Sequence, residues 1–239
     1  MPNSFIKNLK KAAILIKRSN KISRSFRIKY SKPHIILLNI KNIIKYGPSA
    51  PKFAETIWVN PQDCSKYLSL ATFRKLYGLS RQEAKGRVID SAWPIEHSRP
   101  ITEVLLIRFC FDHWVKGIPW EETGAYERME KLIRLSSEGR SHGCKTIDDI
   151  VKRYENLDLI YEQAKREGRL RTNEEISPDY DWTAREMLIH IGPGGELFKG
   201  GEGMHRFAIA SILGVSFPAQ IGCVHVSALP YLDSLRQNN

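Results

Sequence analysis

Residues 187–226 read MLIHIGPGGELFKGGEGMHRFAIASILGVSFPAQIGCVHV, and this stretch decides the predicted fold. Short apolar or alternating runs, typical of strands, are separated by glycine-rich turns and by one run with helical spacing. Glycine follows the helical run at Gly214, as is common where helices end. We expect the following elements in chain order: strand 187–191, turn 192–195, strand 196–198, loop 200–203, helix 205–213, strand 218–226 and a short helix 227–235.

The loop before the predicted helix has the composition of an anion site. Gly200, Gly201 and Gly203 let the backbone approach a ligand without a Cβ in the way. The unpaired N–H groups at the helix start favour an anion. His205 and Arg206 lie in the first turn, where the helix dipole disfavours a cation unless an anion is bound beside it. A guanidinium binds phosphate oxygens through two hydrogen bonds, so Arg206 is a candidate phosphate ligand.

Glu202 lies next to this positive site, where a carboxylate suits a metal ion on the phosphates or a proton transfer. The alternative is a plain turn and helix whose His205 and Arg206 reach solvent. The stretch has neither the Walker A pattern nor the dinucleotide glycine fingerprint. The residues alone therefore leave both interpretations open.

The run from Gly201 to Ala210, followed by Leu213-Gly214, Pro218 and the apolar residues 219–224, resembles the ParB/sulfiredoxin superfamily. Members share an acidic residue or glycine, then Gly-x-[His/Arg]-Arg, a small-residue helix, Leu-Gly and a valine- or isoleucine-rich strand. The predicted hairpin at 189–198 fits the same fold. The chain is also similar to a group of uncharacterised prokaryotic proteins with a helical region before such a domain, which brings no known reaction.

The resemblance implies an α+β protein with a mainly helical N-terminal and middle region. A small ParB/sulfiredoxin-like mixed β-sheet domain with a Gly-x-His-Arg loop-helix would follow. The expected divisions are a basic arm (1–54), a mostly helical region (55–177) and this domain (178–239).

The resemblance also implies a nucleotide, because ParB proteins hydrolyse CTP, sulfiredoxins use ATP and free serine kinases phosphorylate serine. The expected ligand is ATP, CTP or ADP with Mg²⁺, and the expected acceptor is an unknown small molecule. Glu202 and His205 would be catalytic, with Glu202 also holding the metal. The phosphate-binding residues would be Gly201, Gly203, Met204, His205 and Arg206.

Two departures narrow the family's functions. Sulfiredoxins place their reactive cysteine where this chain has Met204, and a thioether forms no thiolate nucleophile. We therefore do not expect sulfinic-acid repair. ParB partition proteins carry a helix-turn-helix domain after this module, whereas a short tail to Asn239 follows here. A chromosome-partition role is therefore not expected either.

The basic residues concentrate near the N-terminus. Residues 1–54 hold 13 of the 37 Lys/Arg and none of the 26 Asp/Glu. Residues 5–30 predict a basic amphipathic helix, which suits an anionic membrane surface, nucleic acid or a plain solvated arm. Residues 34–44, rich in isoleucine and leucine, predict a strand. The partner contacts of the arm would come from Lys7, Lys10, Lys11, Lys17 and Arg18.

The middle of the chain predicts helices without an obvious reaction centre. Glu121 and Glu122 open a helix, where carboxylates belong on dipole grounds. Thr146 and Asp149 form a weak capping-box pattern. The expected elements are strand 55–59, a helix ending at Tyr77, a strand within 86–93, helix 103–116, a helix from Pro119 to Ser136, and helix 148–167.

Several other polar residues have structural explanations that compete with a role in a site. His190 is expected to be a core or surface histidine rather than a site residue, and residues 179–181 to be a polar loop. Arg153 and Asp158 share a helix and are candidates for packing against the C-terminal site. The pairs His142/Cys144 and Cys223/His225 suggest zinc only weakly, because structural sites usually use two-residue gaps.

Cysteine use and hydropathy favour a cytoplasmic protein that is peripheral to the membrane if the arm binds lipid. No apolar run reaches the ~20 residues of a membrane span.

The sequence leaves three functions open. The first is a nucleotide-dependent phosphotransferase or NTPase. The second is a nucleotide-gated module that docks to membrane or nucleic acid without catalysis. The third is a scaffold without a ligand.

Overall fold

The computed structural model describes residues 32–176 and 186–237 of the chain. It divides into two compact units, Met1–Pro48 and Ser49–Asn239. In the first unit the described element is helix α2 (Lys32–Tyr46). The strand expected at 34–44 is therefore wrong. Isoleucine favours strands by composition, but the apolar residues recur here every three to four residues, and this helical period decides the structure.

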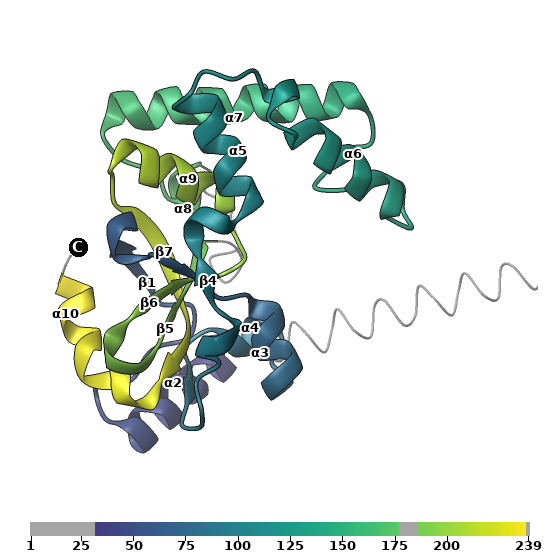
Figure 1. Cartoon of the computed structure of the whole chain (residues 1–239). Helices are drawn as coiled ribbons and strands as arrows, with labels where there is room; N and C mark the ends of the chain where they lie inside the picture. Colours follow the sequence, from purple (N-terminus) through teal and green to yellow (C-terminus); the bar gives the residue numbers. More distant parts are fainter. Residues whose placement is uncertain (1–31, 177–185, 238–239) are drawn as a thin grey trace, which may run out of the picture. The chain divides into compact units, whose positions relative to one another are not determined.

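The second unit is an α+β fold built on a mixed seven-stranded sheet (Figure 1). Its main path runs β1-β7-β5-β6-β2-β4, and β3 also pairs with β7. The pairs β5–β7, β3–β7 and β2–β6 are parallel, and the others are antiparallel. The strands are β1 (Thr56–Val59), β2 (Lys66–Tyr67), β3 (Arg87–Ile89), β4 (Arg99–Pro100), β5 (Met187–Ile191), β6 (Leu197–Lys199) and β7 (Phe217–His225).

The C-terminal elements agree with the sequence. β5 and β6 form the expected antiparallel hairpin, and β7 is the expected buried strand. Strands β1 to β4 come from residues 56–100 and complete the same sheet. The regions 55–177 and 178–239, expected as separate divisions, therefore share one sheet.

The helices of this unit follow their sequence signals. Thr146 and Asp149 form the expected capping box, and Gly168 ends the helix that they begin. The single helix expected from Pro119 to Ser136 is split in two, because Gly124 adopts a φ of 85° between the pieces. The α-helices are α3 (Leu70–Tyr77), α4 (Arg81–Ala84), α5 (Leu105–Trp114), α6 (Ala125–Leu135), α7 (Ile147–Glu167), α8 (Asn173–Ile176), α9 (Met204–Leu213) and α10 (Leu232–Gln237).

Short 3₁₀ segments join these elements. They are η1 (Pro61–Asp63), η2 (Ile95–His97), η3 (Ile101–Glu103), η4 (Trp120–Glu122), η5 (Pro193–Gly195) and η6 (Val226–Tyr231). Two of them, η4 and η6, replace parts of helices that the sequence predicts as continuous, at 119–136 and 227–235. Pro230 lies inside η6 and disfavours a regular α-helix there.

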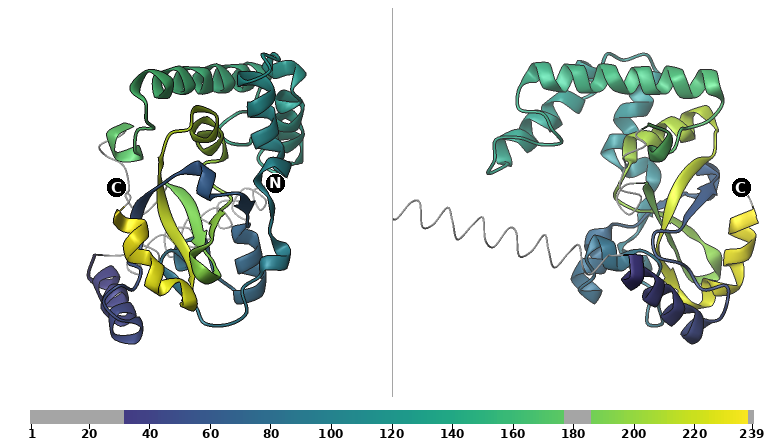
Figure 2. Two further views of the ribbon diagram at one scale, coloured as in Figure 1. Left: turned by 60° about the vertical axis from the view of Figure 1, so that its left-hand side comes forward. Right: turned by 180° about the vertical axis from the view of Figure 1, so that it is seen from behind.

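The core has two parts, one on each face of the sheet. Alternate residues of β5 divide between them: Met187, Ile189 and Ile191 join the cluster beneath α5, α7 and α9, while Leu188 joins the cluster with Phe73 of α3. This alternation is the period of a strand buried on both faces. Helices α5, α6 and α7 form what we call the helical layer. Figures 1 and 2 show α9 lying between α7 and the sheet, so α9 faces this layer.

Asp158 connects the helices of that layer. Its carboxylate accepts hydrogen bonds from Trp114 Nε1 at 2.8 Å and from Trp120 Nε1 at 3.1 Å. His113 Nε2 lies 3.1 Å from the same oxygen. The carboxylate thus ties α5 and η4 to α7. Within residues 32–176 and 186–237, no helix is long and apolar enough to cross a membrane.

Candidate functional site: a cationic cleft

The start of α9 is open at its N-terminal end. Gly203 caps the helix with a φ of 68°, and this N-cap residue makes no side-chain hydrogen bond to the first turn. The N–H groups of Met204, His205 and Arg206 precede the first internal helical bond, which Phe207 donates to Gly203 O at 2.9 Å. A Cβ at position 203 would overlap Met187 Cγ, so the close approach of loop and strand requires glycine. These amides, expected to favour an anion, face a cleft.

Lys199 supports the loop from the buried side. Its side chain is fully buried, and Nζ donates to Gly200 O at 2.8 Å and to Glu202 O. Burial lowers its pKa to about 7, with the Arg206 charge adding to the shift and Cys64 and Glu202 opposing it. Two carbonyl oxygens of the loop are thus paired inside the protein. An anion at the helix start would therefore not be repelled by unpaired carbonyl oxygens of this loop.

The cleft has a volume of about 860 Å³ and lies between α9 and the helical layer. We call it the cationic cleft, because the described residues that line it include more Lys and Arg than Asp and Glu. The acids are Asp149 and Glu202. The bases are Arg81, Arg128, Lys152, Arg153 and Arg206.

Two histidines report the positive potential of the cationic cleft. The pKa of His205 falls to about 3, first through burial and then through Arg153, His142 and Arg128. Burial also lowers the pKa of His142, and Arg153 and Arg128 add to that shift. Both rings are therefore neutral near pH 7, while the arginines stay charged.

Buried polar atoms of α7 and α9 in the cleft are unsatisfied. The buried atoms His205 Nε2 and Arg153 Nε have no hydrogen-bond partner among the described residues, and both residues line the cationic cleft. Buried polar atoms normally have partners, since an unpaired one costs about 1–3 kcal/mol. These two atoms are therefore candidate ligand contacts.

The loop opposite α9 is held in an uncommon conformation. His142 has a φ of 50°, a region that non-glycine residues rarely adopt. Arg153 Nη1 of α7 donates to His142 O at 3.3 Å, and the bridge between Ser141 and Cys144 closes the turn. Such outliers often mark binding sites, and this one lines the cationic cleft.

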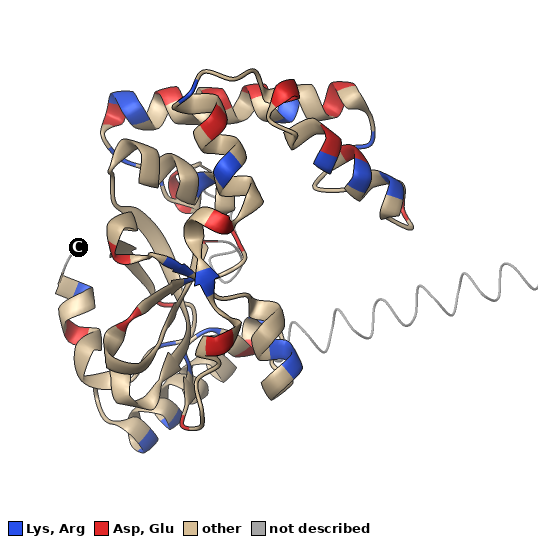
Figure 3. Ribbon diagram, in the orientation of Figure 1, with Lys and Arg blue, Asp and Glu red and all other residues tan. Residues whose placement is uncertain are grey.

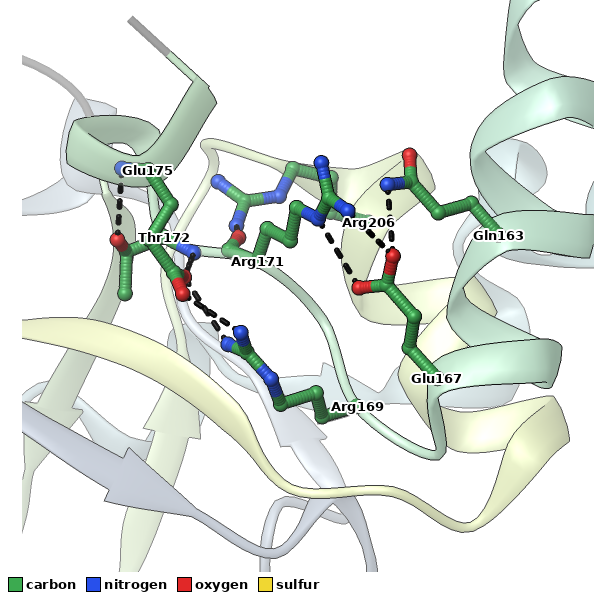
Figure 4. Close-up of polar contacts among 7 residues, drawn as sticks. All are labelled: Gln163, Glu167, Arg169, Arg171, Thr172, Glu175 and Arg206. Atoms are coloured by element: carbon green, nitrogen blue, oxygen red, sulfur yellow. Dashed lines mark hydrogen bonds and ion pairs between the residues drawn. The ribbon is translucent and has the colours of Figure 1, made fainter. Parts of the chain in front are cut away.

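Arg206 is held by its own chain rather than directed at a ligand. Its Nη1 donates to Glu186 at 3.0 Å and to Asn173 at 3.1 Å, and Nη2 donates to the Arg171 carbonyl. Figure 4 shows this guanidinium beside the network that Glu167 and Arg171 form. The guanidinium donors expected to bind phosphate thus hold Arg171 and Asn173, which follow α7 in the chain, against α9.

Glu202 and Met204 also have intramolecular surroundings. The Glu202 carboxylate forms an ion pair with Arg81 of α4. Met204 is buried beneath the helix start, so its backbone amide rather than its side chain is available to a ligand. Gly201 and Gly203 are exposed at the mouth of the cationic cleft, as a backbone-binding loop requires.

The structure brings together residues that sequence reasoning left apart. The sequence does not point to Arg128 or Lys152, it suggests His142 only as half of a weak zinc pair, and it suggests Arg153 only as a helix residue that packs near the site. Figure 3 shows why charge alone does not reveal them, since α6 and α7 carry basic and acidic residues interleaved. A usable signal was the shared face of α7, where Arg153, Leu157 and Ile160 recur at helical spacing and line the cleft.

The other candidates, apart from His142 and Cys144, lie away from the site. His190 is a core histidine: it is fully buried, its Nδ1 accepts the Cys223 amide at 3.0 Å, and burial lowers its pKa to about 3. The four cysteines are free and buried, and no group of three metal-binding side chains occurs within the described ranges. Residues 5–30 and 179–181 lie outside the described residues.

No family model matches the chain, and no curated protein and no solved structure matches it either.

Proposed function

We propose that the chain binds a nucleotide, with its phosphates in the cationic cleft against the first turn of α9. The observation that carries the proposal is the convergence of open helix amides, Arg153 and Arg128 around a neutral His205 whose Nε2 lacks a partner. Backbone amides and guanidinium groups are the usual ligands of phosphate. The volume of about 860 Å³ is within the range of small-molecule pockets.

The same arrangement supports the ParB/sulfiredoxin-like nature of residues 178–239 as a proposal. The order of strand, glycine loop, helix and strand is that of β6, residues 200–203, α9 and β7. The ligands proposed are ATP, CTP or ADP. The roles of Gly201, Gly203, Met204 and His205 become backbone and ring contacts to phosphate.

A magnesium ion fits this cleft only as a companion of the phosphates. Mg²⁺ binds oxygen ligands and commonly uses one or two carboxylates plus phosphate oxygens. Glu202 is the acid positioned to supply one, once its ion pair with Arg81 opens, because Asp149 is occupied in capping α7. Phosphoryl transfer to a small acceptor or to water is the proposed reaction. The attacking oxygen would form a bond to the terminal phosphorus of the nucleotide and give its proton to Glu202, while the bond from that phosphorus to the bridging oxygen breaks and the shortened nucleotide leaves.

The direct test is calorimetric titration of the full chain with ATP, CTP and ADP, each with and without Mg²⁺. Arg153→Gln should weaken binding by about ten- to a hundredfold, because a charge-assisted hydrogen bond contributes roughly 1.5–3 kcal/mol. Arg166→Gln is the matched control: Arg166 is exposed on the same helix and lies outside the cleft. Equal affinities for the two variants, or no binding of any nucleotide, would refute the proposal.

Catalysis is separated from binding by a second measurement. Release of inorganic phosphate, or its transfer to an added hydroxyl compound, is followed with the tightest-binding nucleotide. Glu202→Gln should abolish turnover and change affinity by less than the Arg153 substitution. If the wild-type chain binds nucleotide without turnover, the remaining candidate is a nucleotide-gated module that docks through Lys7, Lys10, Lys11, Lys17 and Arg18.

A further inference from the structure

Helix α2 presents an apolar face to solvent. Five large aliphatic residues of its 15 are exposed, with Leu37 at 63% and Ile44 at 80%. At about 100° per residue, the five fall within an arc of roughly 120°. They are Ile36, Leu37, Ile40, Ile43 and Ile44. Exposed aliphatic residues gathered on one face, rather than scattered, indicate an interaction surface.

Charge on the same segment selects the partner. Lys41 and Lys45 flank one border of the apolar arc, and α2 contains no acidic residue (Figure 3). Residues 1–54 carry 13 Lys/Arg and no Asp/Glu. An apolar stripe bordered by lysines suits the boundary of an anionic bilayer, where aliphatic side chains enter the acyl region and ammonium groups meet the headgroups.

The described length of α2 is less than the thickness of the hydrocarbon layer. Fifteen residues extend about 22 Å at 1.5 Å per residue, which is less than the ~30 Å of the hydrocarbon layer. A helix of this length is also marginal when isolated in water, so burial of its apolar face at an interface would stabilise it.

We infer that α2 is an interfacial helix that docks the chain on an anionic lipid surface through Leu37, Ile40 and Ile44. This inference does not rest on the nucleotide proposal, because α2 belongs to the first unit and the cationic cleft to the second. The proposed docking helix α2 includes residues 34–44, for which the sequence alone predicts a strand.

The test is co-sedimentation of the full chain with vesicles of phosphatidylcholine, with and without phosphatidylserine. Leu37→Ser/Ile44→Ser should lower partitioning onto the anionic vesicles by at least about tenfold, since two large aliphatic side chains would no longer enter the bilayer. The matched control is Leu135→Ser/Leu159→Ser, which removes two comparably exposed leucines (74% and 69%) from the second unit and should bind like the wild type.

The charged border is tested separately. Lys41→Gln/Lys45→Gln should weaken binding to phosphatidylserine vesicles by about fivefold per lysine while leaving the weak binding to phosphatidylcholine unchanged. The inference fails if the Leu37/Ile44 variant binds like its control. It also fails if light scattering shows that the apolar face instead joins two copies of the chain, or if binding to duplex DNA alone responds to the lysine substitutions.

Discussion

His205 is kept neutral at a position where cations surround it, and this costs stability in acid. An unfolded histidine takes up a proton near pH 6.5, whereas the pKa of folded His205 is about 3. Between these values the unfolded state binds more protons, so the free energy of unfolding falls as the pH decreases. Fully buried His190 contributes in the same window, because its pKa is also about 3.

The expected result is a steep loss of stability between pH 6.5 and pH 4 in urea denaturation. Each histidine adds up to about 1.4 kcal/mol per pH unit to the slope. His205→Leu should make the slope shallower, because it removes a ring whose pKa burial lowers to about 3. Superimposable pH profiles for His205→Leu and the wild type would show that the ring is not held neutral.

At the scale of one element, the two ends of α9 provide an internal comparison. Gly203 and Gly214 have almost the same φ, 68° and 67°. A Cβ at 214 meets nothing within 4 Å, whereas one at 203 overlaps Met187. Gly214→Ala should cost about 1–2 kcal/mol from left-handed strain alone. Gly203→Ala should cost clearly more by thermal unfolding and should weaken phosphate binding. Equal losses of stability in the two variants would mean that the Met187 side chain moves aside for the new Cβ at no cost in free energy.

The elements that could be predicted from sequence are those whose signals are local. The capping box at Thr146 and the glycines at 78, 168 and 214 place helix ends within a few residues, because caps act on the adjacent turn. The isoleucine content of residues 34–44 predicts a strand, whereas the period of their apolar positions is that of the helix α2. The break at Gly124 was missed, since a glycine alone does not signal the positive φ that ends one helix and begins another.

At the scale of the whole second unit, the missing information was long-range. β7 pairs with β1, β3 and β5, and no local pattern states which distant strands will meet. The same limit applies to the cationic cleft. The glycine loop at 200–203 can be predicted from the sequence, but Arg128 and Arg153 line the same cleft only because α7 packs against α9 and α6 packs against α7. Arg206, which the sequence places at the phosphate, instead binds Glu186.

A ligand held between these layers should couple them, and this can be measured by hydrogen exchange. The cleft is lined by Gly143 and Cys144 from the helical layer and by residues 201–204 from the loop of the sheet layer. Bound phosphates would contact both sides, so the amides of both segments should gain protection together when nucleotide is added. Helix α10 (Leu232–Gln237), which is outside the cleft, is the internal reference and should not change. In Arg153→Gln the gain should shrink on both sides at equal nucleotide concentration. Protection confined to one layer would mean that the cleft is not closed by a single ligand.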